Sequence, residues 1–304
     1  MGIRKHAYLI MAHNHFGYLK QLMKALDDPQ NDIYVHIDKK AEFNDLDLLK
    51  EGILYSSVFF IQRRDVKWAA YSGILCEMDL LKAATGGQQY DYYHLLSGAD
   101  LVLKPQDEIH HFFEQNQGCE FVAFDAEMID PQYLERIKYY YFFQDVYGRN
   151  RKNIFLLALF ALDKALLFVQ KLIHINRLRK ETVNFQKGAN WFSITHDFAL
   201  HVLQQEKWIK KVFRYSLSGD ELFLQTILSN SEFRNSLFQT KSLKDNTNLR
   251  LIDWNRGKPY TWRIEDYDIL IHSDMLFARK VDPETDNEII NRIEKAIKKK
   301  QGIA

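Results

Sequence analysis

The chain has 304 residues, of which 46% are hydrophobic and 27% are charged, a balance typical of a globular protein that buries a large core. Its 41 basic and 40 acidic residues leave a net charge of +1, which argues against a nucleic-acid-binding protein that works by neutralising phosphates. Two cysteines, Cys76 and Cys119, form neither a disulfide framework nor a metal-binding pattern and favour a reducing compartment. The apolar run within Met1–His13 is too short for a signal peptide or an anchor, so we expect a cytoplasmic protein.

The first 125 residues alternate runs of β-branched and aromatic residues with helical patterns. Strands are predicted at Ala7–Ala12, Ile33–Ile37, Val58–Ile61, Tyr92–Leu96 and Phe121–Phe124, and helices at Gly17–Leu26, Asp45–Lys50, Ala69–Ala84 and Gln106–Phe113. This alternation predicts an α/β fold with a central, mostly parallel sheet that helices flank on both faces.

Polar residues follow the predicted strands, at the end where parallel sheets bind ligands. They are His13-Asn14, Asp38-Lys39, Arg63-Arg64 and Ser97–Asp100, and we expect them along one rim. No Gly-x-Gly-x-x-Gly sequence follows the first strand and no Walker loop is present, so the two common nucleotide-binding motifs lack support.

Residues 149–180 are predicted to form a helical insertion. The run Ile154–Leu162 is apolar on all sides, but Asp163, Lys164 and Lys171 follow it, and a spanning helix needs about 20 nearly uncharged residues. Basic residues flank the run on both sides: Arg149, Arg151, Lys152, Arg177, Arg179 and Lys180. The pattern fits either a helix in the interface of an anionic membrane or a helical hairpin buried against the main domain.

The remaining elements are shorter. They are a strand at Gly188–Thr195, a helix at Asp197–Gln204, short elements at Leu249–Ile252 and Ile269–Ser273, and an amphipathic helix at Glu288–Lys299. Between them, Ser218–Thr226 places the acidic pair Asp220-Glu221 where a loop meets an apolar helical run. The helix dipole alone explains acids in a first turn, and a general base at the edge of a cleft is the alternative.

Two ways of balancing the charge of a diphosphate substrate can be compared. The Asp45-Leu46-Asp47 sequence lies in a polar helical segment rather than at a strand end, and His36 with Asp38 makes only two ligands on one strand face. Fixed cations can hold a leaving phosphate through charge-assisted hydrogen bonds. Arg263 and Lys280 each follow a short apolar stretch and are the candidates for this task.

Eight motifs occur in an order that resembles one enzyme family. They are Ala7–Ile10 with His13, Val35–Lys39, Val66–Ser72, Tyr92–Asp100, Lys187–Ser193, Gly219–Glu221, Leu249–Trp254 and Leu276–Lys280. Together they resemble the core-2/I-branching enzymes and peptide O-xylosyltransferases of glycosyltransferase family 14. The resemblance covers nearly the whole chain, 1–304, as a single domain, except for the insertion at Asn153–Ile175.

The resemblance implies a GT-A-like nucleotide-sugar-binding fold. It also implies an inverting transfer of N-acetylglucosamine or xylose from a UDP-sugar donor to a saccharide acceptor, with no cofactor and no required metal. Glu221 falls at the position of the family's catalytic base, and Arg263 and Lys280 fall at the cations that hold the UDP diphosphate. The other implied contacts are Asp38, Asp100 and His13 for the donor, and Trp254, Trp191, Glu135, Arg136 and Lys138 for the acceptor, although Trp191 also fits a core position.

Animal members of that family carry a membrane anchor, a stem and several disulfides, and this chain has none. A compact chain fits a bacterial enzyme of surface-polysaccharide assembly that acts on lipid-linked acceptors. The insertion would then dock beside the acceptor, with the protein at the cytoplasmic face of the inner membrane. A metal-dependent transferase and a non-catalytic carbohydrate-binding protein on the same fold are the two alternatives.

Overall fold

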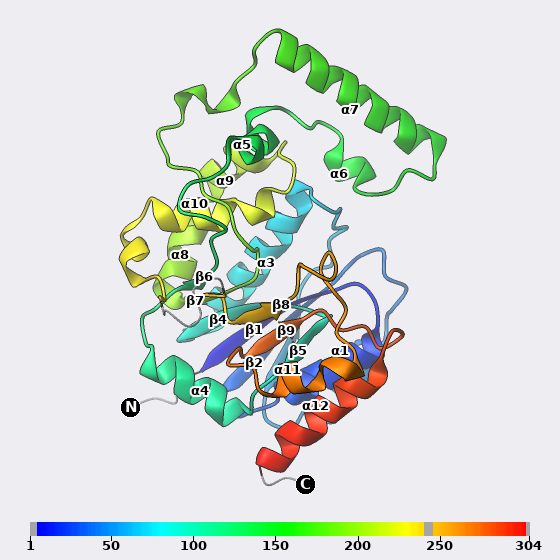
Figure 1. Cartoon of the computed structure of the whole chain (residues 1–304), viewed down its shortest axis with the longest axis vertical. Coiled ribbons are helices and arrows are strands. Elements are labelled where there is room, and N and C mark those ends of the chain that lie inside the picture. The colour runs from blue at the N-terminus through cyan, green and yellow to red at the C-terminus, as the bar shows by residue number, and fades with distance from the viewer. Residues whose placement is uncertain (1–4, 240–245, 302–304) are drawn as a thin grey trace.

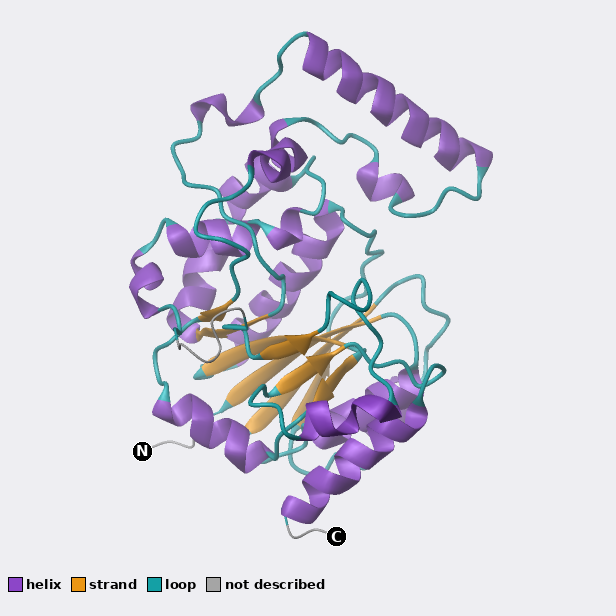
Figure 2. Ribbon diagram, in the orientation of Figure 1, coloured by secondary structure: helices purple, strands orange, loops and turns teal. Residues whose placement is uncertain are grey.

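The computed structural model describes residues 5–239 and 246–301, and over these residues the strands form one sheet of six and one of three. The larger sheet has the order β3-β2-β1-β4-β7-β6 and lies at the centre of the molecule with helices on both sides (Figure 2). Its strands are β1 (His6–Ala12), β2 (Asn31–Ile37), β3 (Ser57–Phe60), β4 (Tyr92–Ser97), β6 (Phe121–Val122) and β7 (Phe192–Thr195).

Strands β1 to β4 are mutually parallel, as predicted, whereas β7 runs antiparallel to both β4 and β6. Successive residues of β1 face opposite sides of the sheet. Ala7 and Leu9 pack in the cluster of α3 (Tyr71–Gly87) and α8 (His196–Gln204), while Tyr8 and Ile10 pack in the cluster of α1 (Phe16–Ala25) and α4 (Gln106–Gln115). Burial on both faces explains why these strands are apolar without alternation.

The predicted strand Gly188–Thr195 is too long, because only Phe192–Thr195 pairs. A Cβ atom on Gly188 would lie 1.8 Å from the carbonyl oxygen of Ala123, so the backbone here approaches the end of β6 as only glycine allows. The predicted strand at Phe121–Phe124 is correspondingly short and ends at Val122.

The smaller sheet has the order β5-β9-β8, formed by β5 (Asp100–Val102), β9 (Phe277–Arg279) and β8 (Arg250–Ile252). Arg250 joins it to the larger sheet. Its buried guanidinium donates hydrogen bonds to the carbonyl oxygens of Leu95 (3.1 Å) and Phe192 (2.6 Å) and to Oγ of Ser193 (2.9 Å). Burial lowers the pKa of Arg250 to about 10, so this connection between the sheets holds a buried charge.

The remaining helices surround these sheets. They are α2 (Leu46–Lys50), α5 (Pro131–Lys138), α6 (Gln144–Tyr147), α7 (Ile154–Leu172), η1 (Arg177–Lys180), α9 (Glu206–Phe213), η2 (Gly219–Glu221), α10 (Phe223–Ser229), η3 (Glu232–Ser236), η4 (Ile264–Asp266), α11 (Tyr267–Ile271) and α12 (Asn287–Lys300). The segment with α6 and α7 forms the end of the molecule farthest from α12 (Figure 1). None of the described helices combines the length and apolar character that crossing a bilayer requires.

Candidate active site

Glu221 lies at the end of η2, a single turn of 3₁₀ helix whose position depends on two residues before it. Ser218 adopts a left-handed conformation (φ 51°), and its N–H donates to the carbonyl oxygen of Ala69 at 2.8 Å. Gly219 is buried so tightly that a Cβ atom would lie 2.4 Å from Oγ of Ser216. Left-handed backbone is uncommon for a residue with a side chain, so packing holds this turn in place.

The Glu221 carboxylate is held by two cations and still reaches solvent. Arg136 of α5 donates from Nη1 to its Oε2 at 2.8 Å, and Nζ of Lys187 lies 3.5 Å from the same oxygen. The ring of Tyr133 lies 4.7 Å from both cationic groups. The Glu221 side chain keeps 38% of its surface exposed, so an incoming hydroxyl group can approach it.

Two further acids lie behind this carboxylate, and neither forms an ion pair in the part of the chain that the structure describes. Oδ1 of Asp220 is buried without a hydrogen-bond partner among the described residues, although the residue keeps partial exposure. Burial and then the charge of Glu221 raise the pKa of Asp220 to about 6. Glu77 of α3 is buried as well, and burial followed by the charge of Asp220 raises its pKa well above the usual range. Because the raised pKa of Asp220 still lies below 7, this buried carboxyl group carries most of its negative charge at neutral pH, beside Glu221.

The structure brings the segments of Arg263 and Lys280 together. The N–H of Trp262 donates to the carbonyl oxygen of Lys280 at 2.9 Å, and the N–H of Lys280 donates to the carbonyl oxygen of Tyr260 at 3.4 Å. Arg263 is exposed and Lys280 is half-buried. The described residues contain no ion pair of either side chain, although the charge of Arg263 is among the causes that lower the pKa of Asp286.

Asp100 is buried and accepts three hydrogen bonds from protein groups. The donors are Nη1 of Arg279 at 2.8 Å, the N–H of Ser97 at 2.9 Å and Oγ of Ser97 at 3.0 Å. The Arg279 guanidinium in turn lies 4.3 Å from the ring of Trp191, whose side chain is mostly buried. Asp100 therefore orients Arg279, and Trp191 supports that arginine from within the core.

Asp38 organises the loop that follows β2. Its carboxylate accepts from the N–H groups of Lys40 (2.8 Å) and Val66 (3.3 Å), and Nζ of Lys40 lies 3.2 Å away. His13 faces the same groups from the end of β1. Burial lowers the pKa of His13, the charge of Asp38 opposes that shift, and the charges of Lys40 and Arg279 add to it. His13, Asp38 and Arg279 thus share the predicted rim.

A short loop connects the two halves of the candidate site. The N–H of Gly188 donates to the carbonyl oxygen of Glu221 at 3.0 Å, and Trp191, three residues later, lies under Arg279. Because extended backbone advances about 3.5 Å per residue, Lys187 and Trp191 are at most about 14 Å apart. One short stretch of backbone therefore joins the Glu221 segment to the Arg279 end of the rim.

The predicted acceptor residues do not gather at one point. Glu135 pairs with Lys171 of α7 at 2.7 Å, and Nζ of Lys138 lies 5.4 Å from the ring of Tyr139. Trp254 is 61% exposed. Of the charged residues on α5, Arg136 is the one that contacts Glu221. The sequence marked this segment as charged but did not indicate the pairing with Glu221.

The two metal-site candidates have other partners in the structure. Nε2 of His36 accepts from the N–H of Arg64 at 2.9 Å, and Asp45 caps α2 by accepting from the N–H of Leu48 at 3.0 Å. Over the described ranges, no group of three or more His, Cys, Asp or Glu side chains stands where it could hold a metal ion.

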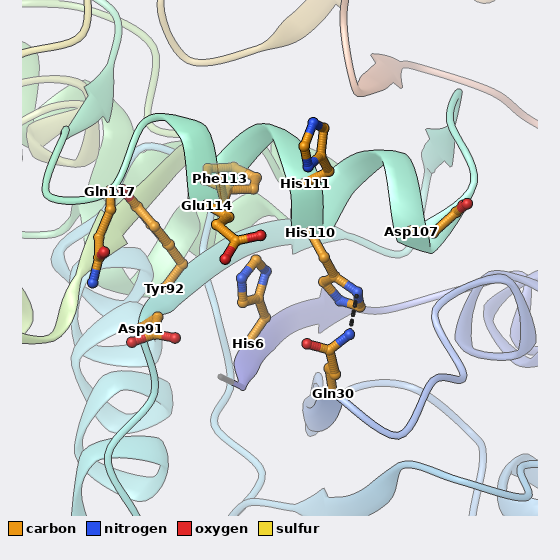
Figure 3. A pocket seen from close by; sticks show the side chains of 10 residues that line it. All are labelled: His6, Gln30, Asp91, Tyr92, Asp107, His110, His111, Phe113, Glu114 and Gln117. Atoms are coloured by element: carbon orange, nitrogen blue, oxygen red, sulfur yellow. Dashed lines mark hydrogen bonds between the residues drawn. The ribbon is translucent and has the colours of Figure 1, made fainter. Parts of the chain in front are cut away.

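A separate cavity of about 410 Å³ opens at the opposite end of the sheet (Figure 3). His6 and Tyr92 line it from the amino ends of β1 and β4, and His110 lines it from α4. Burial lowers the pKa of both histidines, which are therefore neutral at pH 7. Because open parallel sheets bind ligands at their carboxyl ends, this cavity is distinct from the candidate site.

The fold and the rim define an α/β protein with a carboxylate and several cations beyond the carboxyl ends of its strands. Residues 6–275 match the model of the family described as Branch: Core-2/I-Branching enzyme. The chain therefore belongs to this family of glycosyltransferases, and the predicted family, enzyme class and GT-A-like fold are confirmed.

Curated relatives are similar over most of the chain. Xylosyltransferase 2 of Canis lupus familiaris is 23% identical over 93% of this chain and 32% of its own length. Xylosyltransferase 2 of Homo sapiens is 24% identical over 82% of this chain and 26% of its own length. Xylosyltransferase oxt of Drosophila pseudoobscura pseudoobscura is 22% identical over 90% of this chain and 31% of its own length. The chain thus spans about a third of the length of the relatives that it matches. Among solved structures, HddC from Yersinia pseudotuberculosis aligns with 42% of this chain and 65% of its own at 16% identity and a TM-score of 0.26, too distant to support any argument.

Proposed function

We propose that the chain is an inverting glycosyltransferase that moves a sugar from a UDP-sugar to a hydroxyl group of a saccharide acceptor. Its place would be in the synthesis of a surface polysaccharide or another glycoconjugate. The observation that carries the proposal is the geometry of Glu221, an exposed carboxylate oriented by Arg136 and Lys187 in a chain of a glycosyltransferase family. Xylose is the first donor sugar to test, because the curated relatives named above are xylosyltransferases, and N-acetylglucosamine is the second.

The proposed reaction is a single displacement. Glu221 takes the proton from the acceptor hydroxyl group as its oxygen attacks C1 of the donor sugar. The bond between C1 and the UDP oxygen breaks, the electron pair leaves with UDP, and the configuration at C1 inverts. Water removes the proton from Glu221 after release of the products.

Arg263 and Lys280 stabilise the charge that grows on the diphosphate. The exposure of Arg263 and the partial exposure of Lys280 support this role. His13 and Asp38 lie with Arg279 on the same rim and contact the nucleotide end of the donor, while Trp254 provides an exposed ring for stacking on the acceptor sugar. With these cations in place, the reaction requires no metal ion.

The test combines binding with turnover. Purified protein is first screened with UDP-xylose, UDP-N-acetylglucosamine, UDP-glucose and UDP-galactose for thermal stabilisation, since a bound donor raises the apparent melting temperature by mass action. UDP release is then measured with a panel of saccharide acceptors, in EDTA and again with Mg²⁺ or Mn²⁺. Transfer that persists in EDTA with inversion at C1 supports the proposal. Activity that appears only with a metal identifies a metal-dependent transferase, and donor binding without transfer identifies a non-catalytic protein.

A further inference from the structure

Helix α7 turns its polar residues inward. Asp163 accepts hydrogen bonds from the N–H groups of Phe142 (3.0 Å) and Phe143 (3.3 Å) and from the hydroxyl group of Tyr147 (2.7 Å). Gln170, two helical turns later on the same face, exchanges two hydrogen bonds with the backbone of Tyr140, at 2.7 and 2.9 Å. These buried contacts fix the rotation of α7 about its own axis.

The outward face of α7 is consequently apolar. Its residues follow the three-and-four spacing of one helix face and include no charged side chain: Ile154, Leu157, Ala158, Ala161, Ala165, Phe168, Val169 and Leu172. Ile154 is 86% exposed, Phe168 70% and Leu172 67%. A surface helix of a soluble domain shows the reverse arrangement, and an exposed apolar patch of this kind marks an interaction site. Figure 1 shows that no other element of the fold covers this helix from outside.

The surface around this face is positively charged. Lys164 and Lys171 lie one above the other along the side of α7, at the border of the apolar residues. Lys152 before the helix and Arg179 and Lys180 after it are exposed. The one acidic residue between positions 149 and 180 is the buried Asp163, so the insertion itself exposes only positive charge, although Glu135 of α5 pairs with Lys171.

We propose that α7 binds the surface of an anionic lipid bilayer, with its apolar outer face in the boundary between head groups and acyl chains. An apolar face bordered by lysines suits this position, because the lysine stems cover apolar surface while their amino groups reach the anionic head groups. Asp163, Lys164 and Lys171 make the helix unsuited to crossing a bilayer, so its 19 residues, about 28 Å long, would lie in the plane of the membrane. A second protein copy would bury the same apolar residues, but it would also bring the exposed Lys152, Lys164, Arg179 and Lys180 toward like charges of the identical surface.

Consecutive residues of α5 connect this surface to the candidate base. Glu135 pairs with Lys171 of α7, and Arg136 pairs with Glu221. A membrane under α7 would therefore bring Glu221 close to a saccharide attached to a lipid carrier. This last step rests on the proposed function, whereas the membrane contact itself does not.

The test measures binding of the full chain to phosphatidylcholine vesicles with and without phosphatidylglycerol, by co-sedimentation. We expect the anionic lipid to raise binding at least 10-fold, and added salt to reverse the gain. The triple variant Ile154→Ser, Phe168→Ser, Leu172→Ser should lose binding to both kinds of vesicle. The triple variant Lys152→Glu, Arg179→Glu, Lys180→Glu should lose only the gain from phosphatidylglycerol, so that its binding to the two kinds of vesicle becomes similar. The matched control is Leu54→Ser with Ile269→Ser, which removes exposed apolar side chains elsewhere and should bind as the parent chain does.

Absence of binding to anionic vesicles, or unchanged binding of the serine triple variant, would overturn the proposal. A dimer in sedimentation equilibrium that the serine triple variant converts to a monomer, without vesicle binding, would identify a second copy as the occupant instead. UDP release with a soluble saccharide acceptor is measured in parallel. If that activity is present while vesicle binding fails, the membrane contact alone is wrong. If vesicle binding is present while no UDP-sugar supports transfer, the proposed function alone is wrong.

Discussion

Arg136 on α5 holds Glu221 on η2, with Nη1 and Oε2 2.8 Å apart across 85 residues of sequence. The backbone joins the same two segments, because the N–H of Leu217 donates to the carbonyl oxygen of Arg136 at 2.8 Å, and Lys187 approaches the same Glu221 oxygen from a third segment. Orientation of a carboxylate by cations on one oxygen leaves its other oxygen for a substrate proton. The first two predictions separate the chemical role of Glu221 from the positioning role of Arg136.

Replacement of Glu221 by Gln removes the base but keeps the size of the side chain and a carbonyl oxygen for Arg136. We expect kcat to fall about 10²–10⁴-fold, which is the usual contribution of a general base. UDP affinity should stay nearly constant, because the carboxylate acts on the acceptor. UDP release kinetics and calorimetric titration with UDP measure the two effects. Near-normal turnover would exclude Glu221 as the base, and Glu288→Gln on the exposed side of α12 is the control.

Arg136 is expected to act by positioning. Arg136→Met should lower kcat by up to about 100-fold while the KM for the donor stays unchanged, because a small displacement of a reacting group is costly. Arg136→Lys should recover part of kcat, since it restores the charge without the planar geometry of the guanidinium. Equal losses in both variants, or a rise in the donor KM, would indicate a merely structural role. Arg292→Met on the exposed side of α12 is the matched control for the loss of one arginine.

Lys280 and Arg263 should determine donor affinity instead. A charge-assisted hydrogen bond contributes about 1.5–3 kcal/mol, so Lys280→Ala and Arg263→Ala should each weaken UDP binding about 10–100-fold. The measurement is calorimetric titration with UDP, with uridine as a ligand that lacks the diphosphate and should bind all variants alike. Lys295→Ala on α12 controls for the loss of one positive charge. Unchanged UDP affinity in both alanine variants would show that other residues bind the diphosphate.

The sequence predicted correctly which residues follow the strands, whereas their role in a site stays a prediction. His13, Asp38 and Asp100 follow apolar runs that indeed became β1, β2 and β4, and the carboxyl ends of parallel strands meet at one edge. Asp100 nevertheless opens a strand of its own, because β5 pairs with β9, which is formed 177 residues later. Pairing between such distant short strands leaves no local pattern.

Contacts between side chains from distant elements could not be predicted either, because they also leave no local pattern in the sequence. The position of Trp191 under Arg279 and the pairing of Glu135 with Lys171 depend on how whole elements pack. The insertion shows the limit most clearly. Its composition revealed an apolar helix, but only the inward hydrogen bonds of Asp163 and Gln170 show which face is exposed.

Arg250 should be essential for the stability of the smaller sheet. Arg250→Met removes the donors for the buried carbonyl oxygens of Leu95 and Phe192, and each unsatisfied buried acceptor costs about 1–3 kcal/mol. Relief from burying a charge offsets part of this loss, so we expect a net destabilisation of roughly 3 kcal/mol. Urea unfolding measures it, with Arg292→Met on α12 as the control. Unfolding at the parent's midpoint would show that the two sheets hold together without Arg250.

The buried carboxyl group of Asp220 predicts an unusual dependence of stability on pH. Its pKa is raised from 3.8 to about 6, so between these values the folded chain binds a proton that the unfolded chain has released. The contribution of this group to the free energy of unfolding is therefore fully present below pH 3.8. It falls as the pH rises through 6, by about 3 kcal/mol in total. Glu77, whose pKa Asp220 also raises, contributes with the same sign.

The Asp220→Asn variant has no carboxyl group at this position to ionise, so its unfolding free energy should not show the loss that the parent chain shows as the pH rises. The variant is expected to match the parent chain near pH 4 and to exceed its unfolding free energy by up to about 3 kcal/mol at pH 8. Urea unfolding at a series of pH values from 4 to 8 measures the difference, and curves that run parallel over this range would contradict the raised pKa. A protein retains such a cost where function needs the group. The same variant should therefore be more stable at neutral pH and slower in UDP release, because it lacks the buried acid whose charge and packing position Glu221.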